Sequence, residues 1–528
     1  MFGYLRRSVL ARASPNSRFF FGPNTTSIIS RRECLAALVT LGVASGCKYS
    51  PALQAVTPPM GSTASLPSKK GSGETPLKFF APEEFGAVGD GVTNDTAAFA
   101  MMSAAVSAVG GGTVYLRKTT YVVGAQGPDG DQSLWWYAIP PAPIMKFQGC
   151  RLNLTILGNG ARLRCADGLR YGTFDPSTGA PTQHPMPFTE TGHIASPYIG
   201  MIVVEDCTGK VEIRDLELDG NSQGLVIGGQ FGDTGWQIPA TGLWLRDNTG
   251  GEHVANVYIH HHGQDGMYLS SLPDRRAGTF IENVVSEYNA RQGCTVGGGS
   301  SYAFVDSKFN HTGRAGLYSS PGAGLDIEAE LHPIRNLSFK GCEFSNNRGV
   351  GMGADSGDSA DATFDDCRFI GTDTFAAWPR KPRFRFSNCV FVGCIVQTYW
   401  DIDNPDDAVQ FRGCRFTDDP ALSPTGQLDV SAVGHGFIAD LGAGDNNVLF
   451  DNCQFDVRNS ALLPYSARCI YNDCTMFQGS DGMPYPRGIY TGSNKIDGNV
   501  GLPSLYLSKV IGQLVLNGQL VPPTNECC

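Results

Sequence analysis

The chain has 528 residues, of which 41% are hydrophobic and 17% charged, and its formal net charge is -10. This composition is that of a folded protein and excludes extended disorder, while the lack of a Lys/Arg cluster argues against nucleic acid, whose binding needs a basic face. Glycine is abundant, at 66 residues, but follows no Gly-X-Y period, so a collagen helix is excluded and the glycines are expected in tight turns.

Residues 1–47 are typical of an export signal. Arg31 and Arg32 precede an apolar run, residues 35–44, which is too short to span a bilayer. The arginine pair resembles a twin-arginine signal, and the Ala-Ser-Gly-Cys sequence ending at Cys47 resembles a lipoprotein cleavage box. We therefore expect export to the periplasm, the outer membrane or the exterior. Lipidation of Cys47 is the only membrane contact predicted, and cleavage nearby by an ordinary signal peptidase is the alternative.

The next segments predict a linker and a cap. Residues 48–77 are rich in Ser, Pro, Gly and Thr, which favours a flexible linker. Residues 85–96 form a Gly/Asp-rich turn that ends in a helix N-cap, and an apolar helix is predicted over 97–109, stopped by three glycines. This segment resembles the N-terminal signature of the pectate lyase superfamily, which includes rhamnogalacturonase- and epimerase-like proteins. The resemblance implies that residues 78–125 cap one end of a right-handed parallel β-helix.

A recurring hexapeptide independently predicts a solenoid. Its form is Phe-x-x-Cys-x-Phe, with Tyr first and Met last in the final copy, and the copies begin at Phe339, Phe364, Phe386, Phe411, Phe450 and Tyr471. The spacing, about 21 to 25 residues with one longer gap, suits one coil of three short strands. Gly, Asp or Asn precedes each Cys, and these residues tolerate the left-handed backbone of a sharp bend. We therefore predict an all-β helix over 126–500, with a C-terminal strand and tail over 501–528.

The same repeat predicts that its Phe and Cys side chains point into the core and stack from coil to coil. The sequence holds 16 cysteines, but no Cys/His pairs at the short spacings of a metal site, so the repeated ones are interpreted as a ladder of buried thiols. Disulfides between neighbouring rungs are not required by this interpretation.

Four segments upstream, aligned on a glycine, predict an outward face. Because alternate residues of a strand face opposite sides, the inward column should be Met267, Cys294, Leu325 and Met352. One outward column is then Tyr268, Thr295, Asp326 and Gly353. The other is Ser270, Gly297, Glu328 and Asp355.

Asp326, Glu328 and Asp355 are the predicted catalytic residues. Rungs about 4.8 Å apart and same-face neighbours about 6.5 to 7 Å apart would crowd these carboxylates and raise at least one pKa. A protonated acid beside an ionised one can cleave a glycosidic bond, with Glu328 or Asp355 as general acid and Asp326 as base or nucleophile. The same oxygens also suit Ca²⁺, which a lyase or epimerase would use together with Arg or His. An ordinary solvated acidic face is the third alternative.

The predicted partner is a polysaccharide. The residues expected to bind it are Tyr268, Arg291, Arg314, Arg348 and His332. A non-catalytic glycan-binding β-helix remains an alternative function. His260, His261 and His262 are interpreted as a polar turn and not a metal site, because strand alternation would put neighbours on opposite faces.

Overall fold

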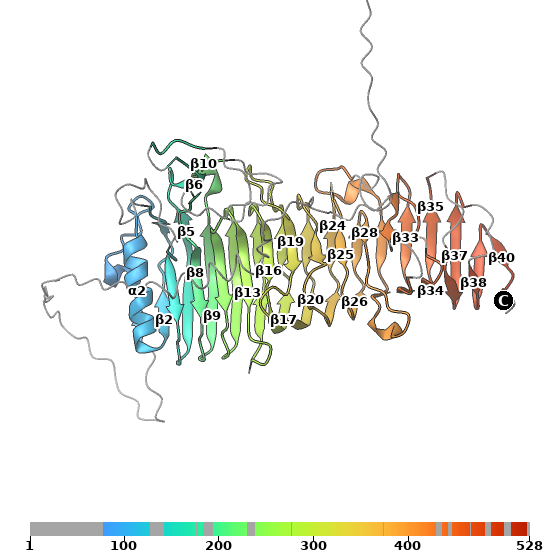
Figure 1. Cartoon of the computed structure of the whole chain (residues 1–528), viewed down its shortest axis with the longest axis horizontal. Helices are drawn as coiled ribbons and strands as arrows, with labels where there is room; N and C mark the ends of the chain where they lie inside the picture. Colours follow the sequence, from blue (N-terminus) through green and yellow to red (C-terminus); the bar gives the residue numbers. More distant parts are fainter. Residues whose placement is uncertain are drawn as a thin grey trace, which may run out of the picture. The chain divides into compact units, whose positions relative to one another are not determined.

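The described residues wind into a stack of β-coils in which each strand pairs with its counterparts one coil before and one coil after (Figure 1). One coil consists of β13 (Asp265–Ser270), β14 (Thr279–Glu282) and β15 (Val285–Glu287). These pair in parallel with β16 (Gln292–Val296), β17 (Gly299–Val305) and β18 (Lys308–Asn310) of the next coil. The computed structural model describes residues 78–126, 142–175, 178–182, 194–229, 238–275, 277–372, 374–428, 436–441, 446–464, 466–480, 487–500 and 508–524.

One face of the coils is a parallel sheet of ten strands. Each coil contributes one strand to it, so residues far apart in sequence become neighbours across the sheet. In sheet order its strands are β4 (Met145–Gln148), β8 (Gly200–Glu205), β11 (Thr241–Arg246), β13, β16, β19 (Ala323–Ile327), β22 (Met352–Ala354), β25 (Ala377–Pro379), β28 (Ile395–Val396) and β31 (Ala439–Asp440).

The other two faces of the coils are covered by a 27-stranded sheet, and a separate three-stranded sheet consists of β6 (Arg170–Thr173), β7 (Ile194–Ala195) and β10 (Val226–Gly228). The two faces meet at one residue per coil with positive φ, as at Asn283 (φ 49°), Asp306 (φ 47°), Gly341 (φ 63°) and Asp366 (φ 54°). These are the residue types predicted for the bend, because Gly, Asn and Asp enter the left-handed region at least cost.

The cap and the final strands differ from the repeating coils. Helix α2 (Thr96–Val109) ends at Gly110, whose φ is 87°, and confirms the helix predicted over 97–109. It packs beside β4 at the start of the ten-stranded sheet. At the other end, β39 (Gln513–Leu516) and β40 (Gln519–Val521) form an antiparallel pair that interrupts the parallel stacking.

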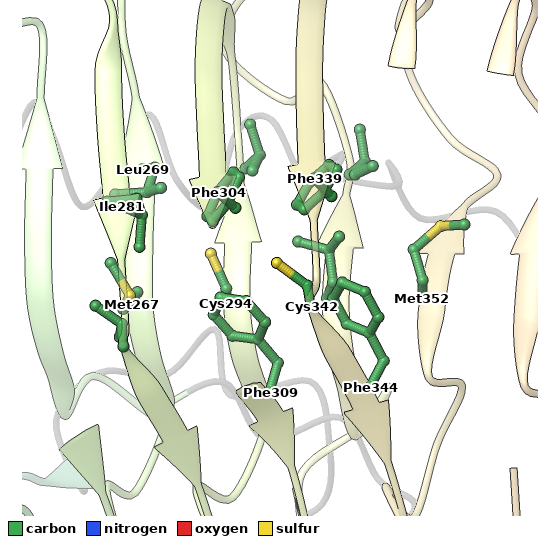
Figure 2. Packing of buried hydrophobic residues seen from close by; sticks show 14 of the residues in the cluster. Met267, Leu269, Ile281, Cys294, Phe304, Phe309, Phe339, Cys342, Phe344 and Met352 are labelled. Carbon is green, nitrogen blue, oxygen red and sulfur yellow. The ribbon is translucent and has the colours of Figure 1, made fainter. Parts of the chain in front are cut away.

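The core follows the predicted Phe and Cys repeat. Phe364 and Phe386 stack with ring centroids 4.7 Å apart, and Phe386 and Phe411 stack at 4.9 Å. The twelve cysteines that the structure describes are all free and buried. Upstream coils fill the same interior with Met, Ile, Leu and Phe side chains, as Figure 2 shows. The prediction of a stacked apolar interior with a thiol ladder is therefore confirmed.

The predicted signal, the linker over 48–77 and Cys47 lie outside the described residues. Within the described ranges, no helix has the length and apolar character needed to cross a bilayer.

Candidate active site

The ten-stranded sheet carries the predicted columns in register. Met267, Cys294, Leu325 and Met352 pair from strand to strand and are fully buried, which confirms the inward column. The adjacent outward column extends beyond the predicted residues in both directions. It includes Trp244, Tyr268, Thr295, Asp326, Gly353 and Trp378.

A chain of hydrogen bonds joins two acids across this column. The Thr295 hydroxyl lies 2.8 Å from Oδ2 of Asp265 and donates to it. The Gln292 amide donates to Oδ2 of Asp326, and its oxygen also contacts the Thr295 hydroxyl. All four side chains are buried, so the network fixes the orientation of both carboxylates.

Arg291 lies between two acids of this cluster. Its Nε is 3.6 Å from Oδ1 of Asp265, and its Nη2 is 3.5 Å from Oε2 of Glu328. The three side chains are at most 5% exposed, so the guanidinium compensates charges that water does not reach. Of the three acids predicted to share a Ca²⁺ ion, the guanidinium contacts Glu328.

Burial raises the pKa of Asp265 to about 6, although Arg291 and the Thr295 hydroxyl act to lower it and the charge of Glu328 acts to raise it further. A carboxyl group with a pKa near 6 is partly protonated close to neutral pH. The site therefore contains one acid that can carry a proton beside acids held by charge-assisted contacts.

Sequence reasoning missed Asp265 because alternation fails at the start of this strand. A Cβ on Gly266 would lie 2.0 Å from Oγ of Ser286 and 2.8 Å from the Gly293 carbonyl, so Gly266 faces the interior. Met267 faces the interior as well, and two inward residues in succession leave Asp265 on the side of Thr295. The sequence offers one signal for it, because Asp265 directly precedes Gly266, the first of the four glycines on which the segments are aligned.

Gly353 leaves room beside the Asp326 carboxylate. A Cβ at this position would lie 3.6 Å from Oδ1 of Asp326 and 3.2 Å from Val350 Cγ1, and it would meet no closer atom. The next residue in the column is Trp378, and on the other side Trp244 packs against Tyr268 with ring centroids 5.3 Å apart. The neighbour of Asp326 in the column therefore has no side chain, and aromatic residues lie further along the column in both directions.

The structure places the other predicted site residues apart from one another. Asp355 is exposed one residue beyond β22, and it occupies the strand-end position that Glu328 has after β19. Tyr268 is buried in the column, with its hydroxyl 3.5 Å from Glu330. His332 packs over Gly298.

Two predicted arginines lie at the turns that precede the sheet. Arg314 donates to the carbonyls of Asn346 and Asn347. The exposed Arg348 lies over the ring of Tyr318, 4.0 Å from its centroid. Of the five residues predicted to bind substrate, only Arg291 and Tyr268 join the acidic cluster or its column.

Part of the chain matches a model of a known protein family. The family model described as "Right handed beta helix region" matches residues 200–396, which include the whole acidic cluster. The chain is a right-handed parallel β-helix.

Several relatives resemble this β-helix over part of their length. Mannuronan C5-epimerase AlgE4 of Azotobacter vinelandii is 48% identical over 235 residues, which cover 40% of this chain and 35% of that protein. The capsule KN3-specific Depolymerase 1 of Klebsiella phage KN3-1 is 25% identical over 354 residues, covering 64% of this chain and 36% of that protein. The chain thus spans about a third of the length of these two relatives. The AlgE4 A-module structure superposes with a TM-score of 0.40 and 18% identity, covering 80% of this chain and 96% of that one.

The β-helix explains how the acidic cluster is held. Asp265, Arg291 and Glu328 come from three successive coils. Asp265 begins β13, Arg291 directly precedes β16 and Glu328 directly follows β19, so all three lie at the ends of strands that the ladder pairing holds in register.

Proposed function

We propose that the protein cleaves a polysaccharide on the outer face of the ten-stranded sheet, at Asp326. The observation that carries this proposal is that Gly353, which has no side chain, lies between Asp326 and Trp378 in the column. A sugar unit placed there would have a carboxylate at hydrogen-bond distance and an aromatic ring one rung away. The names of the relatives, a capsule depolymerase and mannuronan epimerases, support a polysaccharide as the substrate class.

In this proposal Asp326 acts as base or nucleophile and a second carboxyl group supplies the proton to the leaving oxygen. Asp355 and Glu328 are the candidates for that acid. Asp355 is exposed to solvent and to a bound polymer, whereas Glu328 is held by Arg291 at 3.5 Å. Asp355 is therefore the better placed of the two to reach the leaving oxygen of a bound polymer.

A lyase or epimerase is the second candidate function. It is favoured by the buried Arg291, because a fixed guanidinium can neutralise a uronate carboxylate and so acidify the proton on the neighbouring carbon. The Tyr268 hydroxyl lies one rung from Thr295 in the same column and offers a group for proton transfer. This reaction leaves a double bond in the product or inverts a sugar centre, so its products differ from those of hydrolysis.

The test is an activity screen of the purified chain on mannuronan and on bacterial capsular polysaccharides. New reducing ends without ultraviolet absorbance indicate hydrolysis, and absorbance of an unsaturated uronide indicates a lyase. A changed NMR spectrum at constant chain length indicates an epimerase. Asp326→Asn should abolish turnover while binding to the polysaccharide persists.

Asp366→Asn is the matched control, because Asp366 is an exposed bend residue of the 27-stranded sheet and the same column carries Asn388 with the same backbone conformation. It should retain the wild-type rate. If Asp326→Asn also turns over at the wild-type rate, the assigned site is wrong. If the wild-type protein binds a polysaccharide but leaves it chemically unchanged, the protein is a glycan-binding β-helix.

We also infer export through the twin-arginine route, on the basis of Arg31 and Arg32. Replacing both with Lys should retain the full-length chain in the cytoplasm during cell fractionation. Labelling with a lipid precursor, lost in Cys47→Ala, tests the lipid anchor.

A further inference from the structure

Three potential metal ligands converge at the turn that follows β9 (Val211–Asp219) and β12 (Glu252–His260). The ligand atoms of Asp219, His260 and His261 all lie within 4.8 Å of one another. The two Nδ1 atoms of the histidines face each other at 2.7 Å, and Oδ1 of Asp219 is 3.5 Å from Nδ1 of His260. None of the three belongs to the proposed catalytic cluster.

The backbone explains why consecutive histidines point to one place. In an extended strand His260 and His261 would face opposite sides, which is why the sequence was interpreted as a polar turn. In the structure His261 has a φ of 57°, in the left-handed region, and this bend turns its ring back towards His260. The alternation argument therefore does not apply at this position.

Glu217 prepares His260 to bind a metal. Nε2 of His260 is 3.1 Å from Oε1 of Glu217, so the nitrogen that carries the proton is Nε2 and the lone pair is on Nδ1. Metal-binding histidines typically donate their other N–H to a carboxylate, which fixes the tautomer and makes the ligand nitrogen more basic. Nδ1 of His260 then accepts the proton on Nδ1 of His261, and a cation can replace that proton.

Surrounding groups hold the rings and acids in place. His260 stacks on Tyr258 at 4.2 Å, and His261 stacks on Tyr288 at 5.3 Å. Arg162 binds Oδ2 of Asp219. Oδ1 accepts a hydrogen bond from the backbone N–H of Asn221 at 2.8 Å and also lies 3.5 Å from Nδ1 of His260.

The geometry points to a site for a divalent transition-metal ion of the zinc class, bound by Nδ1 of His260, Nδ1 of His261 and Oδ1 of Asp219. Two imidazoles and one carboxylate are ligands that Zn²⁺ accepts, with a fourth position left for water or substrate. Bonds of about 2.0 to 2.1 Å in tetrahedral geometry would separate the two nitrogens by about 3.3 Å, so the rings must part by about 0.6 Å. Because the ligands come from two adjacent coils, the ion would also tie β9 to β12.

The test is calorimetric titration of the full, untagged, EDTA-treated chain with ZnCl₂, together with the visible spectrum of the Co²⁺ form. We expect one Zn²⁺ to bind per chain at these three ligands, and the Co²⁺ form to show the visible absorption band of tetrahedral Co²⁺. His261→Asn should abolish both signals. Glu217→Gln should weaken Zn²⁺ binding by about 10- to 100-fold, the usual effect of removing a supporting carboxylate.

His311→Asn is the matched control. His311 also has a left-handed backbone (φ 56°) and also stacks on Tyr288, but it is not a member of the cluster. Asn fits this column, because Asn346 already occupies the next rung with a φ of 53°. The inference is overturned if His261→Asn binds Zn²⁺ as tightly as the wild type, or if the wild type binds none at millimolar Zn²⁺.

Discussion

Gly353→Ala separates a role in substrate binding from a role in folding. Gly353 lies in β22 next to Asp326, and the added methyl would stand 3.6 Å from Oδ1 of that carboxylate. A substrate oxygen must approach the carboxylate to about 2.6 to 3.2 Å for proton transfer. The methyl group occupies that approach, so the variant should lose activity while its fold persists.

Gly353→Ala should affect the catalytic rate much more than the free energy of unfolding. The nearest atom to the new methyl is Val350 Cγ1 at 3.2 Å, which a small movement relieves, and Ala in a strand is favoured over Gly by about 0.5 to 1 kcal/mol. The free energy of unfolding should therefore change by less than about 1 kcal/mol. A substrate displaced by about 1 Å from the reacting group loses about 100-fold in rate, which is about 2.7 kcal/mol in activation free energy.

The assay is kcat/KM on the polysaccharide that the wild-type protein turns over, with thermal unfolding of the same samples. Gly351→Ala is the contrast, because its Cβ would lie 2.4 Å from the Ala376 carbonyl and must displace backbone. That variant should lose stability first. A Gly353→Ala protein with the wild-type kcat/KM would refute the placement of substrate beside Asp326.

Other predictions test the core and the buried charges. Since burial raises the pKa of Asp265 from 3.8 to about 6, stability should fall as pH rises through this window, and Asp265→Asn should escape the fall. In urea unfolding, the free energy of unfolding of the wild type should fall by about 3 kcal/mol relative to that of Asp265→Asn between pH 4 and 6, with no further change above pH 6. A difference that does not change with pH contradicts the assignment. Phe386→Ala should lower the free energy of unfolding by about 3 to 5 kcal/mol, and Phe386→Leu by less, because the ring stacks on both neighbouring coils. Burial raises the pKa of Cys389 and Cys453, and all twelve described thiols are buried, so at most four of the 16 cysteines should react with Ellman's reagent before unfolding.

The regular part of the fold could be predicted because it obeys a simple repeat. The Phe-x-x-Cys-x-Phe unit places two apolar side chains on either side of a bend, and the residue at the bend is a Gly, Asn or Asp. Pattern and backbone preference agree at every copy, so the inward column and the coil period follow from the sequence alone. The outward register from Tyr268 to Gly353 follows for the same reason.

The partners of the site residues could not be predicted in the same way. Asp326 lies in β19 and Glu328 directly follows that strand, but their contacts with Gln292 and Arg291 depend on side chains from the preceding coil. The sequence indicated repulsion between acids. The structure instead supplies a buried guanidinium, whose position depends on how the turn before β16 aims the side chain.

The two sites have a common physical origin, which is a local failure of strand alternation. At Gly266 the chain turns two successive residues inward and so places Asp265 on the side of the sheet that carries Thr295. At His261 a left-handed residue brings neighbouring imidazoles together. Regular positions of a β-helix are committed to stacking on the coils before and after, so they have little freedom to form new chemistry. Positions that break the pattern are relieved of that constraint, and Asp265 and His261 are two positions of this kind at which ionisable side chains converge.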